Sequence, residues 1–256
     1  MSTAVAKITR AELPVLSSSM AGFGTGLQNV KEKDLLVPRI SIASGNSKAL
    51  AKGTEQYIKG LEPGDLYNTV TGEVFGEKVT VAPLWFSRNR ILFDPNWKIE
   101  CSSPDGETGG QLTPEGCDKC VHSEWGSGKD GSGTACTEFL NFAVAILGDG
   151  PAKLGSISFK NTSQRVAHKW NTLIMGREAR DEAENIISMP CFLGAYEYSV
   201  VSVPGKKGAY HAPSINNAVE NRGLVPEKDI ARVTDLFQRF NNREINISSA
   251  EVELGE

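Results

Sequence analysis

Four of the five cysteines lie close together, with the spacing C-x15-C-x2-C-x15-C over residues 101–136. A Cys-x-x-Cys pair presents two thiolates from one tight turn, and two outer cysteines on flanking strands can complete a tetrahedron around Zn²⁺. Four protein ligands leave no coordination position for water, so such a site is structural rather than catalytic. We therefore predict one structural Zn²⁺ per chain, held by Cys101, Cys117, Cys120 and Cys136.

The segment that holds these cysteines is rich in Gly, Ser, Asp and Thr and poor in large apolar residues. Metal binding could supply the folding energy that its side chains do not. A set of scattered reduced thiols is the alternative. His122 could replace one ligand, although four cysteines suffice. Cys191 lies in a β-like run and is most simply a small buried apolar residue.

Aromatic residues interleaved with basic ones form a second pattern. Tyr196 and Tyr198 are two residues apart on an expected strand, so both rings face the same side. Trp85 is followed closely by Arg88 and Arg90. Exposed rings can stack on nucleobases while cations pair with phosphates, an arrangement that suits a single nucleic-acid strand. Ordinary core packing is the alternative for these rings.

Basic residues also flank an expected helix and occupy the tip of an expected turn. Lys160, Arg165 and Lys169 lie around a helix that should begin near residues 161–162, and they could follow a nucleic-acid backbone. A solvated helix face is the alternative. The turn at residues 204–208 carries two lysines. The candidate DNA contacts are therefore Trp85, Arg88, Arg90, Lys160, Arg165, Lys169, Tyr196, Tyr198, Lys206 and Lys207.

Catalytic signatures are weak. The histidines, at positions 122, 168 and 211, have neither triad nor metal-ligand spacing, and the sequence contains no Walker-type lysine loop. Acidic residues are numerous, but the expected strands carry no convincing cluster of the kind that a metal-dependent nuclease needs. We therefore predict that the protein is not an enzyme.

Composition is that of a soluble globular protein. The chain has 256 residues, a formal charge of −4 and 39% hydrophobic residues, which are ordinary values for this class. No run approaches the roughly 18 apolar residues of a membrane span, and residues 1–20 contain no apolar signal core. We therefore expect a cytoplasmic protein without a membrane partner, a compartment in which cysteines stay reduced.

The charge is unevenly distributed along the chain. Residues 1–60 and 152–180 are mainly basic, whereas the charged groups of residues 247–256 are all acidic. This pattern predicts a surface that binds polyanions and an acidic C-terminal tail. A solvated surface of mixed charge is the alternative, and on charge alone it is the simpler one.

The order of expected elements predicts a mainly β fold with flanking helices, of the α+β class. Five strands, with a helix between the third and fourth, match the OB-fold, a Greek-key barrel whose ligands contact strands 2–3 and the loops L12 and L45. The cysteine-rich insertion then lies between strands 1 and 2, as L12, and the lysine turn is L45. Two more helices are expected at 177–187 and 227–241. The five strands are expected at 78–93, 139–147, 154–159, 191–203 and 209–215.

Four regions follow from this assignment. Residues 1–34 are expected to form a flexible lead-in, because serines and glycines break any periodicity there. Residues 35–215 form the OB-fold domain with its zinc-binding insertion at 101–136. Residues 216–247 contain the C-terminal helix, and residues 248–256 form the acidic tail.

The stretch PGDLYNTVTGEVFG, at residues 63–76, resembles a segment of DNA-replication-module proteins of tailed bacteriophages. The similarity continues through residues 79–93, into the cysteine insertion, and on to residues 159–171. As a whole, residues 35–215 resemble a phage single-stranded DNA-binding protein with an OB-fold. The resemblance implies sequence-independent coating of single strands during replication or recombination. It also implies that the acidic tail contacts replication or recombination proteins.

Two functions of other classes stay open at this stage. One is a phage nuclease or recombination enzyme with a structural zinc module, and the other is a zinc-stabilised adaptor that binds protein alone. The net charge does not decide among them, because DNA binding depends on the local field rather than on total charge. Self-association also stays open.

Overall fold

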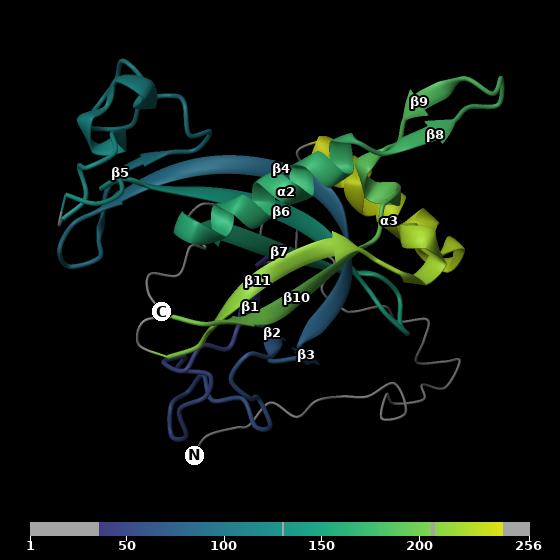
Figure 1. Ribbon diagram of the computed structural model, residues 1–256, viewed down its shortest axis with the longest axis horizontal. Helices are drawn as coiled ribbons and strands as arrows, with labels where there is room; N and C mark the ends of the chain where they lie inside the picture. Colours follow the sequence, from purple (N-terminus) through teal and green to yellow (C-terminus); the bar gives the residue numbers. More distant parts are fainter. Residues whose placement is uncertain (1–35, 130, 206–207, 243–256) are drawn as a thin grey trace, which may run out of the picture.

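The computed structural model describes residues 36–129, 131–205 and 208–242 (Figure 1). Its main element is an antiparallel sheet in which five strands follow the order β11-β10-β4-β6-β7, and β5 pairs with the end of β4. The strands of this sheet are β4 (Lys78–Phe93), β5 (Ile99–Ser103), β6 (Thr137–Leu147), β7 (Lys153–Lys160), β10 (Tyr196–Val203) and β11 (Tyr210–Asn217).

Strand β4 is the centre of the sheet and its longest member, with 16 residues. Its first residues pair with β10, and nearly its whole length pairs with β6. Pro83 lies where the β4–β6 register shifts, a position at which a missing N–H does little harm to the ladder. Beyond β10, β4 and β6 continue as a long ribbon that carries β5 and the cysteine-rich insertion away from the sheet (Figure 1).

A helix covers each face of the sheet. Helix α2 (Gln164–Met175) packs on one face through Trp170, which is fully buried against the rings of Phe142, Phe159 and Tyr196. Helix α3 (Glu227–Asn241) packs on the opposite face, where small residues of the strands leave room for it. The residues buried at the second face include Ala82, Leu84, Ala143, Ala145, Val233, Leu236 and Phe240.

A smaller sheet of three strands joins the main sheet at its open side. It consists of β1 (Ile40–Ile42), β2 (Leu66–Asn68) and β3 (Val74–Gly76). Arg39 forms a parallel bridge with Ser156 of β7, and the Ser156 N–H donates to the carbonyl oxygen of Pro38 at 2.8 Å. Because β1 also contacts β11, this segment spans the gap between the two outer strands of the main sheet.

Residues 177–187 differ from the sequence-based expectation. The predicted helix is wrong, because β8 (Glu178–Arg180) and β9 (Ile186–Ser188) form a hairpin here that projects from the body (Figure 1). The Asp181 carboxylate accepts the backbone N–H groups of Ala183 and Asn185, both at 2.9 Å. Such side-chain bonding to nearby backbone favours a turn over a helix.

The predicted class is confirmed, since the described residues are mainly β with antiparallel sheets and two α-helices. The predicted bounds of β4 and α3 agree with the structure, whereas β10 begins five residues later than predicted, after a turn of 3-10 helix. The expected lead-in at 1–34, Lys206, Lys207 and the acidic tail at 248–256 lie outside the described residues. Within the described residues, neither α-helix is long and apolar enough to cross a membrane.

Candidate functional site

The four clustered cysteines come together from three parts of the insertion. Cys101 lies on β5. Cys117 begins a short 3-10 turn and Cys120 directly follows it, and Cys136 directly precedes β6. All four line one small pocket, which Arg90 and His122 also border. Their thiols are free, and no disulfide joins them. Among residues 36–129, 131–205 and 208–242, however, no group of three or more His, Cys, Asp or Glu side chains is arranged to hold a metal ion.

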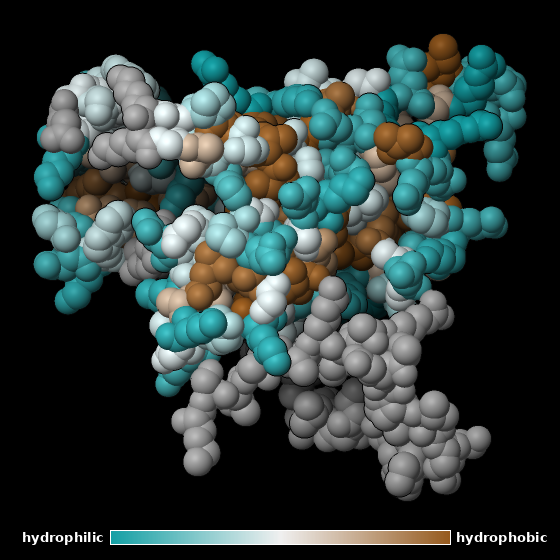
Figure 2. Space-filling model, turned by 60° about the horizontal axis from the view of Figure 1, so that its bottom comes forward, coloured by the Kyte–Doolittle hydropathy of each residue, from teal (hydrophilic) through white to brown (hydrophobic). Residues whose placement is uncertain are grey.

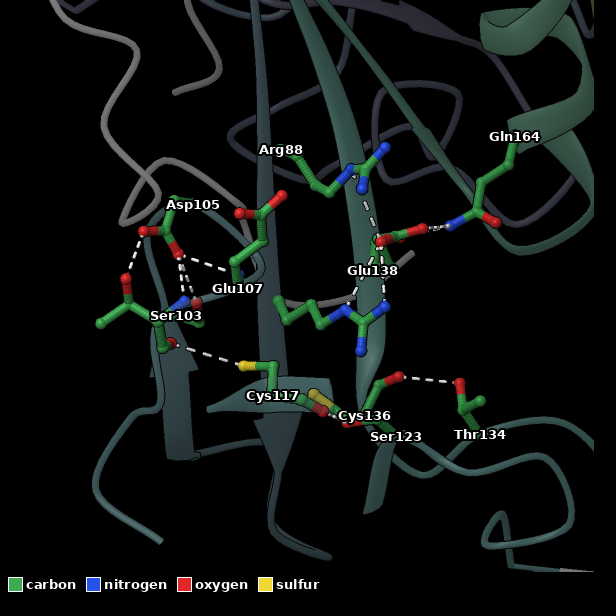
Figure 3. Close-up of polar contacts among 12 residues, drawn as sticks. Arg88, Ser103, Asp105, Glu107, Cys117, Ser123, Thr134, Cys136, Glu138 and Gln164 are labelled. Atoms are coloured by element: carbon green, nitrogen blue, oxygen red, sulfur yellow. Dashed lines mark hydrogen bonds and ion pairs between the residues drawn. The ribbon is translucent and has the colours of Figure 1, made fainter. Parts of the chain in front are cut away.

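Backbone hydrogen bonds hold the cysteine turn in place. The Cys117 N–H donates to the carbonyl oxygen of Glu107 at 2.9 Å, and the Cys136 N–H donates to that of His122 at 2.9 Å. Gly116, with φ of +124°, makes the backbone bend that precedes the turn, a conformation that side chains disfavour. Figure 3 shows Cys117 and Cys136 close together at the end of the β4–β6 ribbon.

The environment differs from one thiol to the next. Burial raises the pKa of Cys136 to about 11, although the nearby Arg90 guanidinium acts in the opposite direction. Burial on its own would also raise the pKa of Cys120. Hydrogen bonds from the Thr113 side chain and from the backbone N–H groups of His122 and Ser123 outweigh it, so the pKa is lowered. Hydrogen-bond donors that point at sulfur are what a thiolate needs for stabilisation.

The insertion has no apolar core of its own. Between residues 101 and 136, with residue 130 outside the description, the only buried side chains are those of Ser103, Cys117 and Cys120. Its larger apolar residues are exposed, and Trp125 is 84% exposed. Apolar packing within the insertion therefore cannot account for its defined conformation.

A carboxylate connects the ribbon to two of the predicted DNA contacts. Glu138 on β6 lies opposite Arg90 on β4 and receives hydrogen bonds from its guanidinium at 3.2 and 3.4 Å. Arg88 forms an ion pair with the same oxygen at 3.7 Å, and the Gln164 amide donates to the carboxylate from α2 (Figure 3). Two cations thus share one anion, which leaves a local excess of one positive charge.

The aromatic candidates divide into two groups. Trp85 is 42% exposed on β4, so its ring is open to a ligand. Tyr196 and Tyr198 are 0% and 3% exposed and belong to the core beneath α2, which corrects the expectation that they stand on an exposed face. The physical reason is that a period of two identifies residues that share a face but does not identify the buried face. Figure 2 shows that the surface still displays apolar patches between polar ones.

The remaining basic candidates are not equivalent. Arg165 and Lys169 are exposed on α2, and the Lys169 ammonium donates to the Asn216 side chain at 2.7 Å. Lys160, at the end of β7, borders a cavity together with Arg39. Sequence reasoning missed Arg39, because no spacing rule connects residues 121 positions apart, and only the bridge between Arg39 and Ser156 brings the two cations to one cavity.

A polar row crosses three strands on the sheet face opposite α2. The Ser158 hydroxyl donates to Asn141 at 2.6 Å, and Asn141 donates in turn to Asn89 at 2.6 Å. Phe139 and Lys160 lie next to this row, with the Lys160 ammonium 5.9 Å from the ring centroid. The Nδ2 of Asn89 is buried without a hydrogen-bond partner. Asn89 and Asn141 are themselves buried, so the row reaches the surface at β7, through the half-buried Ser158 and the exposed Lys160. A ligand at this edge would therefore contact Ser158 and Lys160 rather than the two amides.

The fold and these features define a mainly β, antiparallel protein with a cysteine-rich insertion and cationic residues on its sheet. A family model for Pam3 phage gp34-like protein matches residues 7–246. Because this match covers more than half of the chain, the protein belongs to the Pam3 phage gp34-like family. Searches of curated proteins and of solved structures found no significant match.

Proposed function

We propose that this phage protein binds single-stranded DNA without sequence preference, through an OB-type barrel, during replication or recombination. The observation that carries the proposal is the strand order β7-β6-β4-β10-β11, with α2 between β7 and β10. If β4, β6, β7, β10 and β11 are numbered 1 to 5 in chain order, their order in the sheet is 3-2-1-4-5. Strand β1 spans the gap between strand 3 (β7) and strand 5 (β11). OB barrels bind oligonucleotides on strands 2–3 and between the loops L12 and L45.

Several features support this assignment of the binding face. Strands 2 and 3 correspond to β6 and β7, which carry the polar row of Asn141 and Ser158 and the cation Lys160. The L12 position corresponds to the cysteine-rich insertion, and the exposed Trp85 lies on strand 1. Trp85, the polar row and Lys160 lie on one face of the sheet, whereas Arg88 and Arg90 lie on the other. Single-strand binding uses exposed rings to stack on bases and cations to pair with phosphates.

The proposal includes one structural Zn²⁺ in the insertion, held by Cys101, Cys117, Cys120 and Cys136. Four thiols around one pocket are a donor set that suits Zn²⁺, and a segment without apolar packing needs another source of stability. The ion would cross-link β5, the cysteine turn and the start of β6. It would therefore order the L12 region and take no part in a reaction.

A binding assay with and without Mg²⁺ tests the proposed function against the two alternatives. Labelled oligo(dT) and a blunt duplex of equal length are titrated with the full chain at two salt concentrations. Retention of oligo(dT) without cleavage, weakening as salt rises, is the expected result. Mg²⁺-dependent cleavage would instead indicate a nuclease. Absence of any shift would favour an adaptor that binds only protein, and equal or tighter duplex binding would contradict the proposal.

The family match supports a phage setting for this activity. A protein that coats single strands during phage replication would act in the host cytoplasm. The acidic tail at residues 248–256 would then contact replication or recombination proteins, as the resemblance to phage single-stranded DNA-binding proteins implies.

A further inference from the structure

A cavity of about 240 Å³ opens where β1 spans the gap between β7 and β11. Arg39 and the residues of β1 form one wall, and Ser158 and Lys160 of β7 form another. Ser163, just before α2, and Pro213 of β11 also border it. We call this cavity the Arg39–Lys160 cleft. Its walls come from segments far apart in the sequence, so it exists only in the completed fold.

The cleft contains two cations and no acidic residue among its lining residues. Desolvation lowers the pKa of Lys160, and the positive charge of Arg39 lowers it further, so the two groups repel each other. The Arg39 Nε donates to the Ser41 hydroxyl at 3.3 Å, and no described carboxylate forms an ion pair with Arg39 or Lys160. A bound anion would relieve this repulsion.

Several other cations of the sheet have an acidic partner. Lys153, on the same strand as Lys160, pairs with Glu73 at 2.9 Å, and Lys78 pairs with Glu197 at 3.0 Å. Arg90 pairs with Glu138. Against this background, two uncompensated cations that face one cavity are what a site for an anionic ligand requires.

The other groups of the cleft fit a phosphate oxyanion. The Ser41 hydroxyl accepts its bond from Arg39, so its own O–H is free to donate toward the cavity. Ser44 adds a second hydroxyl at the rim. A guanidinium, an ammonium and hydroxyl donors together form a common recognition set for phosphate. The cleft also adjoins the polar row of β6 and β7, since Ser158 belongs to both.

We propose that the Arg39–Lys160 cleft binds a phosphate group, and that in the DNA complex this group is a backbone phosphodiester of the single strand. The second half of this statement rests on the proposed function. The cleft would hold the strand at the edge of the barrel, beside β7, so that the nucleotides next to it cross the face of β6 and β7.

Charge-removing and charge-keeping variants test the proposal. The double variant Arg39→Gln/Lys160→Gln removes both cations, Arg39→Lys/Lys160→Arg keeps them, and Lys52→Gln removes one exposed lysine outside the cleft lining. Affinity for fluorescent oligo(dT) is measured across a salt series, and thermal unfolding by circular dichroism verifies that each variant is folded. We expect the double glutamine variant to bind at least about tenfold more weakly at low salt. The slope of log K against log salt should become shallower by about 0.7 for each phosphate that the variant no longer neutralises.

The controls separate this proposal from the function on which it rests. The charge-keeping variant and Lys52→Gln should stay within about twofold of the wild-type affinity. If wild-type protein binds oligo(dT) and the double glutamine variant behaves like Lys52→Gln, the cleft proposal is overturned while the proposed function stands.

A second arm applies even if oligo(dT) does not bind. Inorganic phosphate and thymidine monophosphate are titrated into isotope-labelled protein, and the amide resonances of Ser41, Ser44 and Ser163 are followed by NMR. Saturable shifts in the wild type that disappear in the double glutamine variant support a phosphate site regardless of DNA binding. Absence of shifts with either probe, combined with no effect on DNA, overturns the site.

Discussion

Phe142 of β6 and Trp170 of α2 stack with ring centroids 4.2 Å apart and ring planes 23° from parallel. This contact fastens the helix to the sheet at the centre of the core, where both side chains are fully buried. Phe159 and Tyr196 meet the same indole edge to face, at 6.4 and 5.8 Å. One residue of α2 thus connects three strands that belong to different parts of the chain.

We predict that Trp170→Ala lowers the free energy of unfolding by about 3–5 kcal/mol, because it opens a large cavity beneath α2. Urea denaturation measures the change. Trp170→Phe is the matched control and should be clearly less destabilising, since the buried indole Nε1 has no hydrogen-bond partner to lose. A Trp170→Ala protein that unfolds at the same urea concentration as the wild type would show that packing of the indole ring is not what holds the helix.

We predict that Cys117→Ser and Cys101→Ser each lower bound zinc from about one equivalent to less than half an equivalent per chain. Both residues line the pocket of the insertion, so each variant removes one of four ligands. Metal content after metal-free purification is measured by elemental analysis. Cys191→Ser is the control and should retain full zinc, because Cys191 lies outside that pocket. A wild-type protein that is folded but metal-free would contradict the zinc assignment.

We predict that Glu138→Gln tightens oligo(dT) binding roughly two- to fivefold at low salt, because the anion shared by Arg88 and Arg90 is removed and both cations become free for phosphate. The effect should shrink as salt rises. Glu197→Gln is the control. It frees Lys78 near the opposite end of β4 and should leave the affinity unchanged. Weaker binding by Glu138→Gln would mean that the ion pairs order the binding face.

We predict that Trp85→Ala weakens oligo(dT) binding by roughly 1–3 kcal/mol, the usual contribution of one stacked base. Tyr196→Phe should leave the affinity unchanged, since that ring is buried beneath α2. It should also preserve stability or raise it, because the buried Tyr196 hydroxyl has no hydrogen-bond partner. Fluorescence anisotropy measures the affinity. A Trp85→Ala protein that binds like the wild type would remove this ring from the interface.

Long, strongly patterned elements could be predicted from the sequence. The run at 78–93 is rich in β-branched and aromatic residues, and α3 has both an N-terminal proline and an apolar stripe, so local signals and tertiary structure agree. At 177–187, helix propensity competed with the Asp181 turn, and the turn prevailed. Propensity is a weak prior that a few local hydrogen bonds can override.

The candidate site was only partly predictable for a related reason. Cysteine spacing selected four side chains that line one pocket, because the Cys-x-x-Cys pair is local and its partners flank it symmetrically, whereas the zinc itself stays a prediction. The burial of Tyr196 and Tyr198 depends on which sheet face α2 covers. The position of Arg39 and Lys160 at one cavity depends on where β1 lies. Both are properties of the tertiary fold, which periodicity along one strand does not contain.

The bridge between β7 and β11 also bears on how the chain acquires its structure. The segment at 38–42 is made early, yet its partners Ser156 and β11 follow more than 110 residues later. Contacts of such long range carry a high loop-closure cost and slow folding. On the ribosome, β1 cannot bridge β7 and β11 until β11 has emerged, so nascent chains shorter than about 217 residues keep this gap open. The Arg39–Lys160 cleft therefore forms among the last features of the molecule, when most of the chain has been synthesised.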